Sequence, residues 1–455
     1  MADTICAIST AMGESGIGIV RLSGKKSIAI GKEIFVRNSD LKEIENRKLI
    51  YGYIMDGNEK IDEVLIAFMK SPYTYTREDM VEIYCHGGIV PVRRILELVL
   101  KKGARLADKG EFTKRAFLNG RLDLSQAEAV IDLIKAKTDE SYDVSLNQLE
   151  GNLSKELKNI RDILLNMIAH IEANIDFSDE DIEDIDYLEL ENQANLVKEK
   201  IDKLLLTTNR GKILRDGLNT VILGKPNVGK SSLLNAMLKE NRAIVTDIPG
   251  TTRDIIEEYV NIDGIPLKII DTAGIRETEN IVEQIGVDKA RDMVNEADLI
   301  IAIFDASEDL SEEDLHIIEI IKDKDTIVLL NKLDLPKEYD KDYLQKLIPN
   351  KEIITTSIAT GIGVDKLENS IKEMFYGGEI NMENDTIVTN IRHKNQLIKA
   401  KDNIVDAIDG IKLNVPIDCI EVDIKNCWDN LGEITGDNIG EDILDKIFSE
   451  FCIGK

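Results

Sequence analysis

The chain lacks several features that would place it in familiar classes of protein. No apolar run approaches the length of a membrane-spanning helix, and the first residues, MADT, lack the basic start of a signal or transit peptide. Its five cysteines are scattered, without the paired spacing of a metal site. The dinucleotide-binding pattern G-x-G-x-x-G is also missing. We therefore expect a cytoplasmic protein with free thiols and no membrane contact.

Positive charge is scarce as well. The 57 lysines and arginines face 85 acidic residues, which gives a net charge of −28 and argues against non-specific binding of nucleic acid by the whole surface. Any RNA contact needs a local basic patch, and the best candidate is the segment 93–121. A mixed, solvated face is the alternative for that segment. Its basic residues are Arg93, Arg94, Lys101, Lys102, Arg105, Lys109, Lys114, Arg115 and Arg121.

The segment 224–231, GKPNVGKS, fits the phosphate-loop pattern G-x-x-x-x-G-K-[ST]. An apolar run that reads as a strand precedes it at 220–223, and a helical apolar pattern follows at 232–238. Glycines let the backbone wrap a phosphate chain, Lys230 adds a positive charge, and Ser231 can ligate magnesium. The context therefore predicts an α/β P-loop domain.

Three later motifs indicate that the nucleotide is GTP. The motif DTAG, at 271–274, follows one expected strand. The motif NKLD, at 331–334, follows another, and its Asp334 can accept two hydrogen bonds from the guanine edge. The segment Ser357-Ile358-Ala359 lies where GTPases carry a base-contact loop, although its sequence is degenerate. The residues expected to bind GTP are Asn227, Val228, Gly229, Lys230, Ser231, Ser232, Thr246, Asp247, Ile248, Pro249, Gly250, Thr251, Thr252, Asp271, Thr272, Ala273, Gly274, Asn331, Lys332, Asp334, Ser357, Ile358 and Ala359.

The first 118 residues predict an α+β domain. Strands are expected at 5–8, 19–22, 62–69 and 80–85, and a helix at 89–100. The glycine-rich segment 13–18 is expected to be a loop, and residues 86–88 a turn before the helix.

Helical patterns lie on both sides of the P-loop domain. A capping box is expected at Ser125, and apolar residues spaced by three and four from 146 to 171 predict one long helix. This arrangement favours a GTPase domain inserted into one helical domain over two unrelated bundles. Further helices are expected at 188–206, 365–375, 392–411, 418–431 and 441–451.

The chain resembles the MnmE (TrmE) family of GTPases that modify tRNA. The segments that carry the resemblance are EFTKRAFLNGRLDL at 111–124, IDF at 175–177, DTAGIR at 271–276 and the terminal CIGK at 452–455. The resemblance implies a multidomain protein with an α+β N-terminal folate-binding domain, an α-helical bundle domain and an inserted α/β P-loop GTPase domain. The implied division gives residues 1–118 to the N-terminal domain and residues 216–377 to the GTPase domain. The helical domain has two parts, residues 119–215 and 378–455.

The resemblance also implies cofactors and partners. The family uses a tetrahydrofolate derivative of the 5-formyl or methylene type, forms a homodimer, and works with the FAD-dependent protein MnmG in a heterotetramer or larger complex. Together they add an aminomethyl or carboxymethylaminomethyl group to carbon five of the wobble uridine in certain tRNAs. Family folate contacts correspond to Arg21, Glu82, Arg121 and Lys455, and Arg121 stands where lysine is more usual.

GTP cleavage in this chain needs a group other than the glutamine of Ras-type enzymes, because Ile275 follows the DTAG motif. The resemblance implies Glu283 as the group that orients water, with a solvated helix residue as the alternative. It also implies potassium bound by Asn227 and the following loop, doing the work of an arginine finger. The expected potassium ligands are Asn227, Thr246, Ile248 and Thr251, and the expected magnesium ligands are Ser231 and Thr252.

Cys452 is the remaining catalytic candidate. The adjoining Gly454 and Lys455 predict a flexible tip with a cation near the thiol, and the resemblance implies a place near the one-carbon donor. A nucleophile, an acid or base, and a packing residue all remain open for it. Two other readings lack tRNA chemistry: a regulatory or ribosome-assembly GTPase, and a helical scaffold with a nucleotide-dependent clamp.

Overall fold

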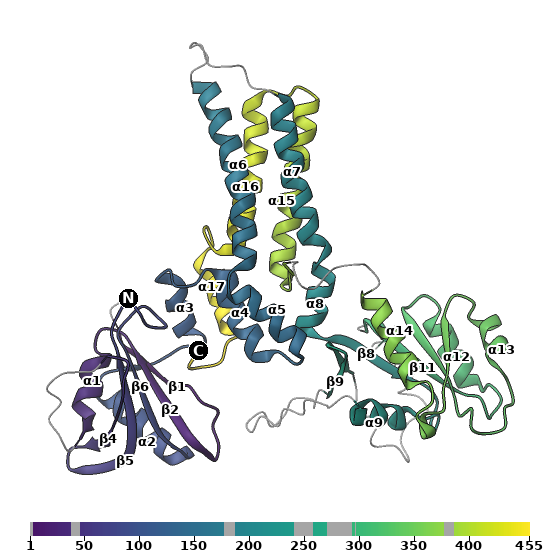
Figure 1. The fold of residues 1–455 in the computed structure, drawn as a ribbon, viewed down its shortest axis with the longest axis horizontal. Coiled ribbons are helices and arrows are strands. Elements are labelled where there is room, and N and C mark those ends of the chain that lie inside the picture. Colours follow the sequence, from purple (N-terminus) through teal and green to yellow (C-terminus); the bar gives the residue numbers. More distant parts are fainter. Residues whose placement is uncertain are drawn as a thin grey trace.

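The computed structural model describes residues 3–37, 46–176, 187–240, 258–270, 294–295, 297–376 and 386–455. Three bodies are visible in Figure 1: an N-terminal sheet, a tall helical bundle and a second sheet with helices. No helix in these ranges combines the length and apolarity needed to cross a membrane. The multidomain fold class expected from the sequence is confirmed, because each body has its own apolar core.

The N-terminal body is a seven-stranded sheet in the order β3-β4-β5-β6-β2-β1-β7. Neighbouring strands are antiparallel except for β1 and β7. Two helices pack on it through Ile30, Ile34, Ile95 and Val99. The elements are β1 Ile5–Ile8, β2 Ser15–Ser23, α1 Ser27–Ile34, β3 Phe35–Val36, β4 Leu49–Asp56, β5 Glu59–Met69, β6 Met80–Gly87, α2 Ile89–Lys101 and β7 Arg105–Leu106.

Two predicted loops in this body are wrong in part. Strand β2 already begins at Ser15, and strand β6 continues to Gly87, so both glycine segments contribute to the sheet. A Cβ on Gly18 would come within 2.3 Å of the Val92 side chain, and one on Gly87 within 2.4 Å of the Ser15 carbonyl oxygen. These glycines therefore allow neighbouring groups to approach the backbone closely within a sheet. A glycine-rich sequence is compatible with this role as well as with a turn.

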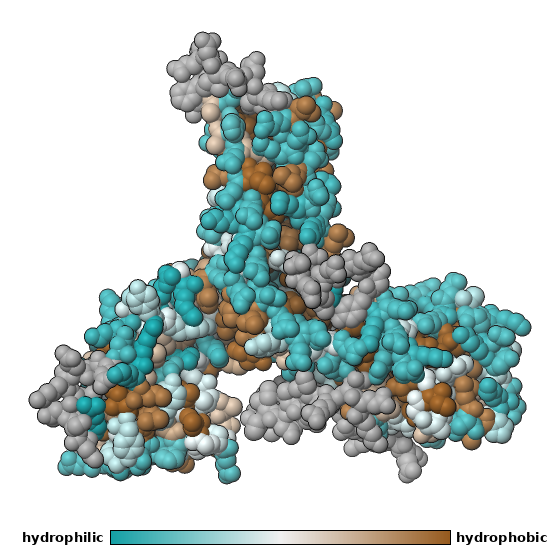
Figure 2. Space-filling model, viewed as in Figure 1, coloured by the Kyte–Doolittle hydropathy of each residue, from teal (hydrophilic) through white to brown (hydrophobic). Residues whose placement is uncertain are grey.

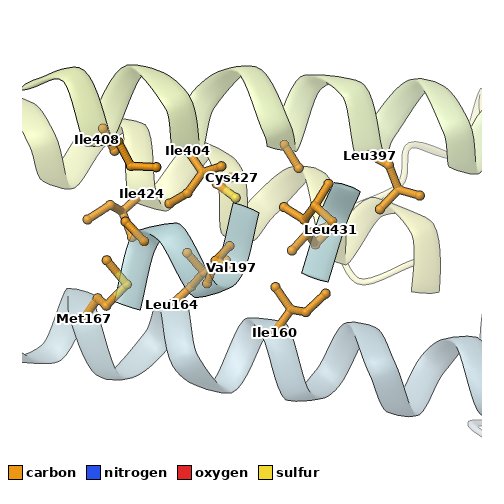
Figure 3. Packing of buried hydrophobic residues seen from close by; sticks show 14 of the residues in the cluster. Ile160, Leu164, Met167, Val197, Leu397, Ile404, Ile408, Ile424, Cys427 and Leu431 are labelled. Atoms are coloured by element: carbon orange, nitrogen blue, oxygen red, sulfur yellow. The ribbon is translucent and has the colours of Figure 1, made fainter. Parts of the chain in front are cut away.

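The tall body is a bundle of four helices that come from both sides of the P-loop segment. Figure 3 shows their shared core, in which Leu164, Val197, Ile404 and Ile424 each come from a different helix. Cys427 lies in the same core, and burial raises the pKa of its thiol to about 12. The helices are α6 Asn152–Asp176, α7 Tyr187–Leu206, α15 Ile391–Lys412 and α16 Ile417–Thr435.

Five shorter helices lie where the three bodies meet (Figure 1). The apolar residues of the last of them, Leu444 and Phe448, pack with Phe451 on Leu124 and Ile131. These helices are α3 Glu111–Leu118, α4 Leu124–Lys135, α5 Asp139–Leu149, α8 Thr208–Asp216 and α17 Glu441–Ser449.

The single long helix predicted from 146 to 171 is wrong. Helix α5 ends at Leu149 and α6 begins at Asn152, because Gly151 between them has a φ of +85°. The predicted capping box also lies two residues too late: Asp123 is the N-cap, and its side chain accepts the backbone N–H of Gln126.

The third body is a six-stranded sheet in the order β13-β12-β11-β8-β10-β9, parallel except for the β10–β9 pair. Alternate residues of its central strand, such as Ile301 and Phe304, belong to separate apolar clusters, so helices cover both faces. The elements are β8 Leu218–Leu223, α9 Lys230–Glu240, β9 Glu258–Ile262, β10 Ile265–Ile269, β11 Leu299–Asp305, α12 Glu312–Ile321, β12 Thr326–Asn331, α13 Lys341–Leu347, β13 Glu352–Thr355, η1 Ile358–Thr360 and α14 Val364–Tyr376.

Candidate functional site

The phosphate loop joins the end of β8 to the start of α9, as the sequence predicts. Asn227 at its tip is exposed and has a φ of +63°. Gly229 has a φ of +113°, and a Cβ there would come within 2.6 Å of the Asn331 side-chain nitrogen. The loop therefore combines a left-handed turn with a close contact to the NKLD motif, and its backbone N–H groups lead into a helix N-terminus, where phosphate binds well.

Lys230 is folded over this loop. Its Nζ donates to the Gly224 carbonyl at 2.6 Å and to the Lys225 carbonyl at 3.0 Å. Burial lowers the pKa of the Lys230 ammonium group, so its charge is only partly compensated by these neutral acceptors. Phosphate oxygens would compensate that charge better, as the P-loop pattern predicts.

Asn331 connects three of the predicted GTP motifs. It is 3% exposed, and its Nδ2 donates to the carbonyl of Val228 in the phosphate loop at 2.8 Å. Its Oδ1 accepts the backbone N–H of Ile358 at 3.1 Å and the Thr356 hydroxyl at 3.2 Å. The role of Asn331 is thus to hold the phosphate loop and the base-contact loop together, which the motif alone does not reveal.

The base-contact loop positions Asp334. Ser357 Oγ donates to Asp334 Oδ1 at 2.6 Å, and the Thr360 hydroxyl donates to Ser357 Oγ at 2.8 Å. Lys332 has a φ of +63°, and its Nζ lies 2.6 Å from Asp305 Oδ2. The degenerate sequence of this loop therefore still supplies a hydroxyl that fixes the carboxylate expected to read guanine.

Sequence reasoning missed Asp305 as a supporting residue. Burial alone would raise its pKa, but the hydrogen bond with Lys332 and those from Ser307 outweigh burial and lower the pKa. Asp305 ends β11, and its acidic side chain gives no signal that separates it from other strand-end aspartates.

Several predicted residues lie outside the described ranges, and their roles stay predictions. Serines 231 and 232 lie in the first turn of α9. Within the described ranges, no group of three or more His, Cys, Asp or Glu side chains forms a metal cluster. The predicted residues outside those ranges are Thr246, Asp247, Ile248, Pro249, Gly250, Thr251, Thr252, Asp271, Thr272, Ala273, Gly274 and Glu283.

A second candidate site lies on the N-terminal sheet. Arg21 on β2 and Glu82 on β6 are cross-strand partners, with Arg21 Nε 2.8 Å from Glu82 Oε1. The Tyr84 hydroxyl donates to the other oxygen of Glu82 at 2.6 Å, and burial together with this bond raises the pKa of Tyr84 to about 12. Glu82, Tyr84 and Arg121 line a cavity of about 670 Å³. Two of the four predicted folate residues, Glu82 and Arg121, therefore line one cavity, and a third, Arg21, pairs with Glu82.

Arg121 enters this site from the helical side. Its guanidinium lies 4.5 Å from the ring centroid of Tyr75, and its NH1 donates to the Tyr75 carbonyl at 3.2 Å. A planar arginine over an aromatic ring leaves its remaining donors available toward the cavity, which suits a carboxylate or a ring carbonyl of a ligand.

The C-terminal tail lies beside this cavity. The Gly454 carbonyl accepts from Arg21 NH1 and from Ser9 Oγ, both at 3.4 Å. Gly454 has a φ of +94°, and a Cβ there would come within 2.3 Å of the Ile8 carbonyl oxygen. The backbone of Cys452 accepts the N–H of Gly110 at 3.3 Å, while its side chain is exposed. The tip predicted to be flexible is therefore fastened to the N-terminal sheet, next to Arg21.

The basic segment 93–121 is largely neutralised within the chain. Arg115 is 3% exposed and contacts Asp3, Glu78 and Glu111. The mixed face fits these contacts better than a bare phosphate-binding surface does. The other pairs are Arg93 with Glu97, Arg94 with Glu59, Lys101 with Asp56, Lys102 with Glu33, Arg105 with Asp3, Asp108 and Glu111, and Lys114 with Asp445.

Known proteins resemble the chain over its whole length. The family models described as GTP-binding protein TrmE N-terminus and MnmE helical domain match residues 4–121 and 124–452. Proteins named tRNA modification GTPase MnmE are similar to it: that of Alkaliphilus metalliredigens is 57% identical over 100% of this chain and 99% of its own, that of Finegoldia magna 55% over 100% of each, and that of Bacillus subtilis 50% over 100% of each.

Among solved structures, the G domain of FeoB from Methanococcus jannaschii is 24% identical and covers 34% of this chain and 96% of its own, with a TM-score of 0.26. So distant a likeness adds nothing to the assignment. The two family models and the full-length relatives decide it: the chain belongs to the MnmE family of tRNA modification GTPases.

Proposed function

We propose that the protein hydrolyses GTP and, with the FAD-dependent partner MnmG, adds a (carboxymethyl)aminomethyl group to carbon five of the wobble uridine of certain tRNAs. The observation that carries this proposal is the position of the C-terminal tail. Arg21 contacts both Gly454, two residues after Cys452, and Glu82, which lines the N-terminal cavity. The backbone just after Cys452 is thus bonded to an arginine that pairs with an acid of the pocket, which supports a role of the thiol in one-carbon transfer to a pyrimidine.

The N-terminal cavity is the proposed site of a 5-formyl- or methylene-type tetrahydrofolate. Glu82 would accept hydrogen bonds from the amino-pyrimidine edge of the ligand, and Arg121 would pair with an anionic or carbonyl oxygen. Arg21 and Lys455 would hold the tail over the bound ligand. Bound folate supplies the one-carbon unit, and the chain's own residues orient it and exclude water.

GTP hydrolysis is proposed to use magnesium and potassium at the phosphate loop. Ser231 and Thr252 would hold magnesium, and Asn227 with Thr246, Ile248 and Thr251 would hold potassium. The exposed amide of Asn227 at the loop tip fits this role, because carbonyl oxygens are suitable ligands for hard cations. A bound potassium would neutralise charge that develops on the phosphates, and Glu283 would orient the attacking water. Equal hydrolysis rates in potassium and sodium would contradict the potassium site.

A homodimer through the N-terminal body is part of the proposal. Leu49 and Tyr51 on β4 and Leu65 on β5 are exposed, as is Tyr73 near the cavity. Apolar surface is visible on this body in Figure 2. Tyr51 and Leu65 are cross-strand partners, and a contiguous exposed apolar patch can mark a contact surface. Light scattering of the double variant L49E/Y51E should show a monomer where the unaltered protein forms a dimer.

The division into residues 1–118, 119–215, 216–377 and 378–455 is also proposed, with the GTPase domain inserted in the helical domain. The shared core of α6, α7, α15 and α16 supports the insertion, because helices from both sides of the GTPase segment form one bundle.

Nucleoside analysis of tRNA tests the whole proposal. A strain that lacks this protein should lose the modified wobble uridine, and the unaltered gene should restore it. The variant C452S should restore GTP hydrolysis but not the nucleoside. A regulatory or ribosome-assembly GTPase would instead leave the wobble nucleoside unchanged in the deletion strain.

A further inference from the structure

Helix α4 contacts described residues on both sides of the P-loop body. On the way in, Arg215 of α8 lies three residues before β8, and its Nε is 2.8 Å from Asp132 Oδ1 on α4. On the way out, Arg392 at the start of α15 donates to both oxygens of Glu128, at 3.0 and 2.7 Å. Asn390 donates to Glu128 as well, at 3.1 Å.

The two carboxylates form one buried polar face of α4. Glu128 and Asp132 are 4% and 7% exposed, and they lie one helical turn apart. His393, fully buried, adds a 2.7 Å contact from Nε2 to Glu128. Ion pairs withdrawn from water hold their geometry tightly, because breaking either one leaves an uncompensated charge. The end of α8 and the start of α15 are therefore fixed to the same short helix.

The apolar side of α4 holds the end of the chain. Leu124, Ala127, Val130 and Ile131 form one cluster with Leu444, Phe448 and Phe451. Phe451 directly precedes Cys452. A shift of α4 by a fraction of a side-chain diameter must move this cluster, since packed cores transmit displacement.

Two further contacts support the same route. Arg392 also donates to the carbonyls of Glu433 and Ile434, at 2.7 and 3.0 Å, and so holds the end of α16 from which α17 follows. The β9–β10 hairpin touches the turn after α4 and the start of α5: Lys137 Nζ lies 5.4 Å from the Tyr259 ring, and a Cβ on Gly264 would come within 2.1 Å of Glu140. This hairpin lies in the chain between residues 246–252 and the DTAG motif at 271–274, which are both expected to bind GTP.

We propose that helix α4 couples the nucleotide state of the P-loop body to the position of Cys452. Movement of the P-loop body acts on Arg215, which lies just before β8, and on the hairpin, which is part of that body. Both act on α4 or on residues 137–140 that follow it, and Arg392 ties α4 to the end of α16. The helix then displaces Phe451 and the adjoining thiol relative to the N-terminal cavity. Asp132 and Glu128 are positioning residues in this scheme, which rests on the proposed roles of GTP and Cys452.

Thiol labelling of the full-length protein tests the coupling. Cys419 and Cys452 are the exposed cysteines and Cys6, Cys85 and Cys427 are buried, so a C419S background leaves Cys452 as the accessible thiol. Its reaction rate with Ellman's reagent is measured with GDP, and with GDP plus aluminium fluoride in potassium. We expect the rate to change about fivefold or more between the two states. In D132N the change should disappear while kcat for GTP hydrolysis stays the same.

The control is D202N, the same chemical change at an ion pair of the bundle. Asp202 pairs with Lys198 and Lys401 and makes no contact with α4 among the described ion pairs, so D202N should keep the nucleotide-dependent change. If D132N unfolds at a much lower temperature than the unaltered protein, the double variant D132N/R215Q is used instead, because it removes both charges of the pair. A labelling rate insensitive to nucleotide in the C419S background, or full sensitivity in either α4 variant, overturns the coupling. If GTP hydrolysis and wobble modification were normal in that case, the proposed function would still hold.

Discussion

Replacing Asn331 by alanine should disconnect the phosphate loop from the base-contact loop. The side chain makes three hydrogen bonds, to the Val228 carbonyl, the Ile358 N–H and the Thr356 hydroxyl. Alanine leaves at least two of these buried groups without their partner. Each buried unsatisfied group costs about 1–3 kcal/mol. The lower end applies here, because water can reach a loop at the edge of the sheet more easily than a core.

The expected loss is therefore about 2 kcal/mol of nucleotide binding, or on the order of 30-fold in Kd for both GTP and GDP. The aspartate variant N331D keeps an oxygen for the Ile358 N–H but turns a second oxygen toward the Val228 carbonyl. It should lose at least as much affinity as N331A. Titration with a fluorescent guanine nucleotide measures both constants.

Thermal unfolding gives an independent reading. At a GDP concentration of 100 times the Kd of the unaltered protein, binding stabilises it by about 2.7 kcal/mol. At the same concentration N331A should gain only about 0.9 kcal/mol. The control N430A removes an exposed amide that bonds to the Asn426 carbonyl on α16, and it should bind normally. An N331A protein that binds GDP within about twofold of the unaltered protein would refute the linking role of Asn331.

Three further outcomes are expected. The variant D334N presents an amide N–H to the guanine donors, so GTP affinity should fall by about 100-fold or more. Affinity for xanthosine triphosphate, whose C2 carbonyl can accept that N–H, should rise, as a competition titration would show. G454A places a Cβ within 2.3 Å of the Ile8 carbonyl, so the strain that carries it should lose the modified nucleoside while its protein keeps full GTP hydrolysis. Although burial opposes it, pairing with His393 and Arg392 lowers the pKa of Glu128 from 4.5 to about 2. The stability that this carboxylate contributes is therefore complete above pH 4.5 and is lost as the pH falls toward 2. In E128Q, the free energy of unfolding should depend less on pH in that window, as acid denaturation would show.

The local patterns of the sequence determined the elements that carry the chemistry. The phosphate loop, the strand that ends at Asn331 and the bundle helices α7, α15 and α16 follow from short-range rules of period and turn chemistry, and the structure confirms them. Several predictions were wrong at glycines, because a glycine can either form a turn or permit close packing. Gly18 and Gly87 permit close packing inside a sheet, and Gly151 ends a helix within a continuous apolar stripe. Periodicity cannot tell these uses apart, because the difference depends on what packs against the backbone.

Only the tertiary structure decided which distant residues act together. Arg21 and Gly454 meet across almost the whole chain, and Glu128 holds Arg392 from the far side of the GTPase segment. The basic segment 93–121 is the best candidate for an RNA surface in the sequence because the acidic residues that pair with it, such as Asp56 and Glu33, lie elsewhere in the sequence. The charge summed over a sequence window includes only residues that are close in the sequence. The charge at a surface of the folded protein also depends on the residues that the fold brings within a few ångströms.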